Sequence, residues 1–331
     1  MPILPKQPVT TYSNSFSLPL VIVNPKSAGG STKDNWAGIA SDLRAHFGAY
    51  NVAFTKAAGD AAVLAKRGCE SGRNFIIACG GDGTINEVAN GILQSGIDVE
   101  LGVMPSGTGG DFRRTLGIPQ SPREAAAALR RGRTKLMDVG KVTFLDHNDE
   151  TGSRYFLNVS SFGLAESIKR VKSTKIFDWL PFATVRGRAN FAVAMLQEFL
   201  GIDPLKIRVR IDDGEEKTLQ TIQFSVANCR YLGGGIMIAP DAKINDGLLD
   251  VVNIGDISTA KIILNAYTLY RGTHNRLDEV QSTTARKIEV SVVNPSKEIL
   301  LETDGELPGK LPAVFEVVPN ALRIRTPKSC S

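Results

Sequence analysis

Three glycine-rich segments hold the residues most able to do chemistry in this chain. They are residues 24–30 (NPKSAGG), 80–84 (GGDGT) and 105–111 (PSGTGGD). Glycine and other small residues let backbone N–H groups come close to an anion, and a helix that begins directly after such a segment favours negative charge. We therefore expect a phosphate-rich ligand to bind at these segments.

The glycine pattern differs from the two commonest nucleotide-binding motifs. No GxxxxGK[ST] segment occurs, and the spacing Gly81-x-Gly83-x-x-Asn86 lacks the last glycine of a dinucleotide fingerprint. Asp82 instead places a carboxylate inside the second segment. Because a carboxylate beside phosphates is repulsive unless a cation lies between them, the pattern implies a divalent metal. Taken alone, Asp82 is equally a turn residue or helix cap, and Asp111 a cap for the short segment after it.

The glycine-rich segments follow predicted buried strands, which determines where they meet. Apolar runs of strand length cover residues 18–24, 74–79 and 100–104, and a fourth strand is predicted at 50–55. Helical patterns alternate with these strands at residues 36–47, 60–71, 84–94 and 121–131. This alternation predicts a parallel sheet with its functional loops at the carboxyl ends of the strands.

After about residue 137 the sequence changes to short β-type runs between turns, which predict antiparallel strands. The runs are residues 137–145, 154–160, 205–211, 218–228, 248–254, 287–293 and 314–318. A helical interlude with basic residues around an apolar section interrupts them at 165–201.

The predicted domain organisation follows from this change. We expect a leader (1–19), a nucleotide-binding α/β domain (20–137) and a β-rich, antiparallel sandwich domain (138–318). Packing of the C-terminal segment 319–331 back on the first domain is left open. The active site is then expected in the cleft between the domains.

Composition excludes several classes of protein. Of 331 residues, 42% are hydrophobic and 22% charged, which excludes a disordered or fibrous chain. The net charge of +5 is smaller than a nucleic-acid-binding protein usually carries, so no nucleic-acid partner is expected. The cysteines and histidines lack the close spacing of a metal site, and a reducing cytoplasm fits them. No run of 18 apolar residues predicts a membrane span, and no signal peptide is recognisable.

The second glycine-rich segment continues as GGDGTINEVANGI at residues 80–92, with NPKSAGG upstream and PSGTGGDF downstream. Further along lie NVSSFG (158–163), GGGIMIAPDAKINDGLLD (233–250) and TDGE (303–306). In this order the motifs resemble the diacylglycerol kinase catalytic domain of lipid kinases, including diacylglycerol, sphingosine and ceramide kinase relatives. GGDGT alone also resembles NAD kinases and phosphofructokinases, and the downstream segments favour the lipid kinases.

The resemblance implies ATP as phosphate donor, Mg²⁺ as its metal and residues 138–318 as the lipid-substrate domain. It also departs from the family at one place, because Gly109 and Gly110 stand where the family usually has Ala-Asn, which removes one amide contact and leaves Asp111. The residues that the resemblance assigns to the nucleotide are Asn24, Lys26, Ser27, Thr55, Gly80, Gly81, Asp82, Gly83, Thr84, Asn86, Glu87, Gly107, Thr108 and Asp111.

The catalytic residues implied by the resemblance are Asp82, Asp304 and Glu306. Glu306 is the favoured general base, which takes the proton of the acceptor hydroxyl as it attacks the γ-phosphorus, and Asp304 orients it or organises the metal. The two roles are open to reversal, and Asp304-Gly305 is also an ordinary hairpin turn pair.

A second, structural metal site is implied by the resemblance at residues 243–248. It consists of Asp246 with backbone groups of Lys243 and Leu248, and its role is to brace the fold. The alternative for Asp246-Gly247 is a plain hairpin turn.

Together these observations predict an ATP-dependent, Mg²⁺-requiring kinase that phosphorylates a hydroxyl of a diacylglycerol-like or sphingoid lipid. The alternatives are a kinase of a soluble acceptor, as in NAD kinases, and a non-catalytic nucleotide- or lipid-binding module. The expected partners are a lipid with a free hydroxyl and an anionic, cytoplasmic membrane surface; a homodimer is left open. The basic residues of 165–201 suit such a surface, although scattered Lys and Arg more often form a solvated face.

Overall fold

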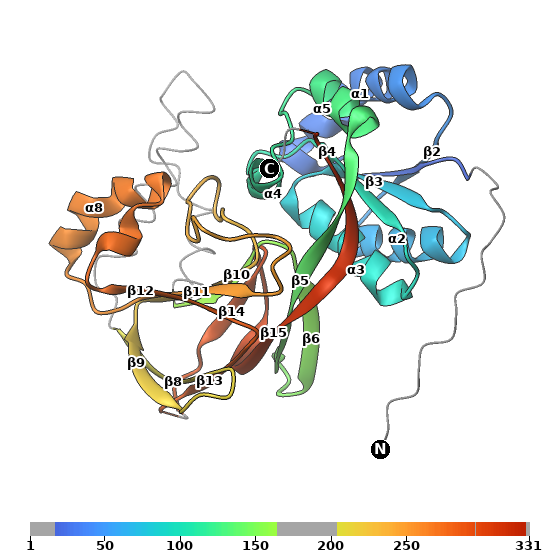
Figure 1. Ribbon diagram of the computed structural model, residues 1–331. Coiled ribbons are helices and arrows are strands. Elements are labelled where there is room, and N and C mark those ends of the chain that lie inside the picture. Colours follow the sequence, from blue (N-terminus) through green and yellow to red (C-terminus); the bar gives the residue numbers. More distant parts are fainter. Residues whose placement is uncertain (1–16, 164–203, 295, 329–331) are drawn as a thin grey trace.

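The computed structural model describes residues 17–163, 204–294 and 296–328 (Figure 1). Most of the predicted leader and the whole basic interlude at 165–201 lie outside this described part. Within it, no helix is both long and apolar enough to cross a membrane.

The N-terminal part is a parallel sheet covered by helices on both faces, as the alternating pattern predicts (Figure 1). Helix α1 packs against α5 and helix α2 against α3. The strands, which lie in the order β4-β3-β1-β2, are β1 Leu20–Val23, β2 Asn51–Phe54, β3 Phe75–Gly80 and β4 Glu100–Pro105. The helices are α1 Ser31–Phe47, α2 Asp60–Glu70, α3 Asp82–Ser95, α4 Asp111–Thr115 and α5 Pro122–Arg131.

Helix α1 begins five residues earlier than the pattern predicts. The short 3-10 helix η1, Ser27–Gly30, precedes α1. Its last residue, Gly30, is the N-cap of α1 and has φ 98°. The first turn, STKDN, is polar and carries no apolar periodicity, so the local pattern does not reveal it.

The C-terminal part is an antiparallel, β-rich domain, also as predicted. Two predicted runs are each divided in two, 154–160 into β6 and β7 and 218–228 into β9 and β10, while β12, β14 and helix α8 have no counterpart in the prediction. Its strands are β5 Arg133–Leu145, β6 Thr151–Phe156, β7 Val159–Phe162, β8 Leu205–Ile211, β9 Lys217–Thr221, β10 Gln223–Ala227, β11 Leu249–Ile254, β12 Val280–Ala285, β13 Lys287–Val292, β14 Leu300–Thr303 and β15 Glu306–Thr326. Its helices are α8 Thr259–Arg271 and the 3-10 helix η2 His274–Arg276.

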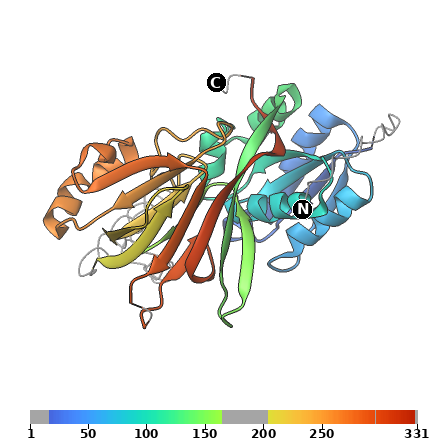
Figure 2. The same cartoon turned by 60° about the horizontal axis from the view of Figure 1, so that its bottom comes forward.

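Strand β15 joins the two parts into one hydrogen-bonded sheet. It pairs with β14, β13 and β5 in the C-terminal domain, and near its end Arg323 and Ile324 pair in parallel with Glu100 and Leu101 of β4. Figure 2 shows this red strand running beside the green β5 from one domain to the other. Only 314–318 was predicted as strand, because Pro319-Asn320 has the composition of a turn; the structure accommodates it as an irregularity between Val318 and Leu322.

Apolar side chains form a separate core in each part. The first core lies between the parallel sheet and its helices and includes Ile22, Ile76 and Leu101. A second core fills the β-rich domain, and a third packs helix α8, through Ile262, against Val252 and Ile254 of β11 and their neighbours. The two domains, joined through β15, leave a cleft between them.

Candidate active site

A cleft of about 600 Å³ lies where the glycine-rich loops face the β14–β15 hairpin. Its size is typical of a small-molecule site. Of the residues predicted for the site, those that line it are Asn24, Ser27, Gly81, Asp82, Gly83, Thr84, Glu87, Gly107, Thr108, Asp111, Asp304 and Glu306.

The second and third glycine-rich loops touch backbone to backbone. A Cβ added at Gly107 would lie 2.5 Å from the Cα of Gly81, so neither loop can approach the other if residue 107 has a side chain. Gly81 is the N-cap of helix α3, whose first residues are Asp82, Gly83 and Thr84. Free N–H groups of a helix N-terminus therefore face the cleft, as an anion site requires.

The first glycine-rich loop is connected to the other two by hydroxyl and amide groups. Asn24 Nδ2 donates to Thr84 Oγ1 at 3.0 Å. The buried Thr32 Oγ1 lies 2.5 Å from both Ser27 Oγ and Ser106 Oγ. Sequence reasoning missed Thr32 and Ser106, although a hydroxyl in the first turn of a helix after a glycine loop is a usable signal.

Asp82 holds the third loop in place. Its Oδ2 accepts hydrogen bonds from the N–H groups of Gly110 (2.8 Å) and Asp111 (3.2 Å), and its Oδ1 accepts one from Phe112 (3.2 Å). These are the first N–H groups of helix α4. The Asp82 carboxylate, which belongs to helix α3, therefore caps the N-terminus of α4 by accepting its hydrogen bonds, and it also lines the cleft.

The Gly109-Gly110 departure fits this arrangement. A Cβ at Gly109 would lie 2.8 Å from Asp82 Oδ2, and Gly110 adopts a left-handed conformation with φ 68° at the N-cap of α4. The two glycines therefore bring the loop backbone directly onto the Asp82 carboxylate.

Asp111 connects the third loop to the C-terminal domain. Its Oδ1 pairs with Arg114 Nη1 at 2.7 Å, and its Oδ2 accepts from the N–H of Gly234 at 2.7 Å. Burial raises the pKa of Asp111, and the negative charge of Asp82 adds to the increase. Arg114 and Gly234 were not predicted as site residues.

Asp304 occupies the tip of the hairpin between β14 and β15 and faces the first domain. Asp304 and Gly305 have φ 48° and 89°, as a two-residue hairpin turn demands. The carboxylate accepts from the N–H groups of Leu157 (2.7 Å), Asn158 (3.0 Å) and Val159 (3.0 Å). Burial raises the pKa of Asp304 to about 6, the backbone hydrogen bonds oppose the increase, and the charge of Asp82 adds to it.

Glu306, at the start of β15, is the most accessible carboxylate of the TDGE motif. Its side chain is 45% exposed, lines the cleft and forms an ion pair of 2.6 Å with Arg154 of β6. Glu302 also lines the cleft; it is buried, accepts from Ser161 Oγ at 2.9 Å and accepts the N–H of Gly305. Sequence reasoning missed both Arg154 and Glu302. Glu302 directly precedes the TDGE motif and could have been found from that position, whereas nothing local relates Arg154 to the motif.

The cleft fits a nucleotide-bound Mg²⁺ better than an ion held by protein alone. Among the described residues, no three His, Cys, Asp or Glu side chains lie close enough to hold a metal. Mg²⁺ is usually bound by one or two carboxylates together with substrate phosphates and water. The negative charges of Asp82 and Asp304 repel each other, and the buried Asn158 Oδ1 has no hydrogen-bond partner. A hydrated cation near them would offset the repulsion between the carboxylates, and one of its water molecules would donate to Asn158 Oδ1.

Four residues predicted for the nucleotide do not line the cleft in the structure. Gly80 ends strand β3, and Asn86 lies one turn into α3, where it contacts the hairpin. Lys26 Nζ donates to the carbonyl of Lys56 at 3.2 Å, and Thr55 is buried beside that segment.

The loop predicted to bind a structural metal, residues 243–248, does not line the cleft. The N–H of Leu248 donates to Asp246 Oδ1 at 3.2 Å, and the N–H of Gly247 donates to Asp138 Oδ2 at 2.7 Å. Asp138 Oδ1 also accepts the N–H of Asn320 at 2.7 Å. Asp138, which was not predicted, thus ties this loop to the irregularity in β15.

The opposite end of the cleft is apolar. It is lined by Ile236, Ile238, Ile254 and Leu269, which come from the loop after β10, strand β11 and helix α8. The cleft therefore runs from a phosphate-compatible end, past carboxylates, to an apolar end in the C-terminal domain.

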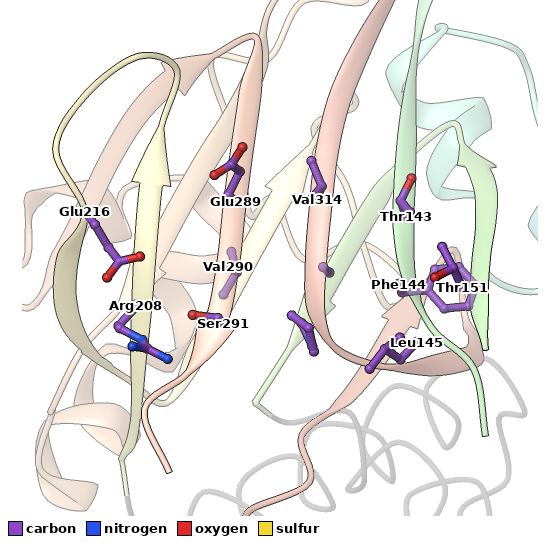
Figure 3. Close-up of a pocket in the computed structure, with 12 residues that line it drawn as sticks. Thr143, Phe144, Leu145, Thr151, Arg208, Glu216, Glu289, Val290, Ser291 and Val314 are labelled. Carbon is purple, nitrogen blue, oxygen red and sulfur yellow. The ribbon is translucent and has the colours of Figure 1, made fainter. Parts of the chain in front are cut away.

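A second hollow, of about 310 Å³, lies on the strands of the C-terminal domain. Figure 3 shows Glu289 and Val290 of β13, Thr143 of β5 and Val314 of β15 on its walls. None of the glycine-rich loops contributes to its lining, so it is separate from the cleft.

Comparison with known proteins agrees with the two-domain fold. Residues 19–142 match the family model of the diacylglycerol kinase catalytic domain, and residues 174–326 match the YegS C-terminal NAD kinase beta sandwich-like domain. A diacylglycerol kinase of Mycobacterium tuberculosis (strain H37Rv) is 30% identical over 273 residues, which is 82% of each chain. One of Bacillus subtilis (strain 168) is 28% identical over 309 residues, covering 93% of this chain and 96% of the other.

A solved structure has the same fold. The crystal structure of a diacylglycerol kinase from Bacillus anthracis (strain Sterne) superimposes with a TM-score of 0.71 at 25% identity, covering 96% of this chain and 100% of that one. The motifs, the two-domain fold and these relatives agree with one another. The chain therefore belongs to the diacylglycerol kinase catalytic-domain family and is a phosphotransferase that uses an alcohol group as acceptor.

Proposed function

We propose that the protein transfers the γ-phosphate of ATP to a free hydroxyl of a diacylglycerol-like or sphingoid lipid at a membrane surface. The observation that carries the proposal is the continuity of the cleft, from the glycine-rich loops through Asp304 and Glu306 to the apolar wall at Ile236, Ile254 and Leu269. A polar phosphate donor needs the glycine-rich end of such a cavity, and an acceptor with a hydrocarbon tail needs its apolar end.

The loops would bind and orient the phosphates. Free N–H groups at the start of α3 and the hydrogen-bonded loops around Thr32 supply preorganised donors to the phosphate oxygens. Asp82 would hold Mg²⁺ together with the phosphates, and the ion, when bound, would neutralise charge on the β- and γ-phosphates. Asp304, whose oxygens already accept four hydrogen bonds, would favour the ion by its negative charge.

Glu306 would act as the general base in the transfer step. It removes the proton from the acceptor hydroxyl, whose oxygen forms a bond to the γ-phosphorus while the bond from that phosphorus to the β-γ bridging oxygen breaks and ADP leaves. Arg154 orients Glu306 through their ion pair, and Asp304 fixes the hairpin that carries it. Closure of the cleft excludes water, which would otherwise accept the phosphate.

The test is transfer of labelled γ-phosphate from ATP, with Mg²⁺, into a total lipid extract. We expect the wild-type protein to label a lipid, and Glu306→Gln to label it about 10²–10⁴ times more slowly, as loss of a general base predicts. Asp82→Asn should also fail, whereas the control Glu316→Gln, on the same strand, should retain activity. Wild-type rates in Asp82→Asn or Glu306→Gln would count against the proposal.

A soluble acceptor is the second candidate, favoured by the NAD kinase-like description of the matched C-terminal domain. Labelled ATP presented with mixed lipid micelles, dinucleotides and sugars in parallel separates the two. Binding of ATP without transfer to any acceptor would instead indicate a non-catalytic module.

A further inference from the structure

Helix α8 presents a stripe of apolar and aromatic side chains to solvent. Leu264 is 73% exposed, more than any other large hydrophobic side chain among the described residues, and Tyr267 is 57% exposed. Three residues apart on a helix, they lie on one face. Side chains this large and this exposed, side by side, usually mark a contact surface.

The opposite face of α8 forms the wall of the cleft. Leu269 lines the apolar end of the cavity, and Ile262 is buried in the core beneath the helix. The Leu269 carbonyl accepts the N–H of Met237, next to the cleft residues Ile236 and Ile238. One helix therefore separates the apolar end of the cleft from the exposed stripe. Figure 1 shows α8 on the side of the C-terminal domain that lies away from the N-terminal part.

The charged side chains on helix α8 itself are basic. Residues 259–277 contain Lys261, Arg271 and Arg276 and no Asp or Glu, whereas the acidic residues Asp256, Asp278 and Glu279 lie just outside this segment. The Arg271 guanidinium lies over the Tyr267 ring, 5.5 Å from its centroid, so a cation borders the aromatic part of the stripe. Lys261 pairs with Glu279 at 2.7 Å, which leaves Arg271 and Arg276 as the exposed cations of this segment.

We propose that α8 is the surface by which the protein docks on an anionic bilayer. Leu264 and Tyr267 enter the boundary between headgroups and acyl chains, and Arg271 and Arg276 contact anionic headgroups. In this orientation the apolar end of the cleft lies directly behind the lipid surface, which shortens the path of a lipid acceptor out of the bilayer. The inference rests on the proposed lipid substrate and locates where it enters.

The first test is flotation of the full-length protein with vesicles of phosphatidylcholine and phosphatidylglycerol in equal amounts. The variant Leu264→Gln/Tyr267→Gln preserves charge and helix propensity and removes the apolar stripe. We expect its bound-to-free ratio to fall at least about 10-fold, with an unchanged melting temperature. The matched control is Val63→Gln, which alters a side chain 50% exposed on helix α2 and should bind as the wild type does.

A second variant tests the contribution of positive charge to vesicle binding. Arg271→Gln should weaken binding to the anionic vesicles and have little effect on the weaker binding to pure phosphatidylcholine. Equal flotation of wild type and double variant, or an equal loss in Val63→Gln, would overturn the assignment of α8. Stripe-dependent binding to a protein, with none to vesicles, would do the same.

A kinetic arm distinguishes failure of docking from failure of the proposed reaction. We expect the double variant to phosphorylate a short-chain, monomeric diacylglycerol at the wild-type rate and a vesicle-embedded one several-fold more slowly. Equal loss on both forms would overturn a docking role. A wild type that is inactive on both, yet floats in a stripe-dependent manner, would overturn the proposed lipid substrate and support the docking surface.

Discussion

The side-chain amide of Asn86 donates a hydrogen bond of 2.6 Å to the carboxylate of Asp304, across 218 residues of sequence. Asn86 lies in the first turns of α3, which follows the phosphate-compatible loop, and Asp304 lies at the tip of the hairpin that carries Glu306. This bond therefore couples the expected phosphate-binding loop to the expected base across the domain boundary.

Replacement of Asn86 by Asp should uncouple the two elements. The variant keeps the size of the side chain but places a carboxylate against Asp304, and we expect kcat/KM to fall at least about 10-fold. Asn35→Asp, an exposed change on α1, is the control for altered net charge. Equal steady-state activity of Asn86→Asp and the control would show that the contact has no catalytic consequence.

Activity should decline in mildly acidic solution because of Asp304. Its pKa is raised to about 6, chiefly by burial, so the carboxylate takes up a proton as the pH falls through that value. A protonated Asp304 loses acceptor capacity for the three N–H groups that hold the hairpin. We expect kcat/KM at pH 5 to be about 10-fold below its plateau.

The same profile measured on Asp304→Asn identifies the group responsible. This variant should have lower activity throughout and should lack the decline centred near pH 6. Persistence of that decline in Asp304→Asn would assign it to another group.

A methyl group at residue 107 should separate the second and third glycine-rich loops. In Gly107→Ala the new Cβ meets the Cα of Gly81 at 2.5 Å, a contact that requires the backbone to move. We expect the Kd for ATP, measured by calorimetry, to rise by on the order of 10-fold and the melting temperature to fall. Gly38→Ala, in open space on α1, should stabilise the fold by about 0.5–1 kcal/mol. Wild-type ATP affinity in Gly107→Ala would refute the required close approach.

A cation at the loop containing Asp246 should stabilise the C-terminal domain. Burial raises the pKa of Asp250 to about 6, the neighbouring Asp246 and Asp241 add to the increase, and Lys243 and Arg230 oppose it. Three carboxylates therefore lie close together at this loop, with two basic side chains nearby. If this loop binds Mg²⁺, as the family resemblance implies, the ion should raise the melting temperature of the wild type by on the order of a few degrees. Asp246→Asn should abolish most of that shift, and an equal shift in both proteins would exclude this loop as the site.

Local sequence patterns are sufficient to predict the fold class and most of the cleft-lining loops. Strand length, apolar runs and helical periodicity depend on neighbouring residues, so the parallel sheet and its glycine-rich connections are recognisable from the amino-acid sequence alone. The β-rich domain is recognisable for the same reason. Its predicted boundaries are less accurate where turn-like residues lie inside a strand, as at Pro319-Asn320 in β15.

Other features are decided only by tertiary structure, because they join residues far apart in the chain. The Asn86–Asp304 bond depends on how the two domains pack. The Arg154–Glu306 ion pair and the capping of α4 by Asp82 depend on how separate elements pack within one domain. No local periodicity encodes such pairs, since each group is satisfied by whichever partner the packed backbone brings within hydrogen-bond distance. The sequence by itself thus determined which residues are able to do the chemistry, and the packing of the hairpin against α3 decided how they meet.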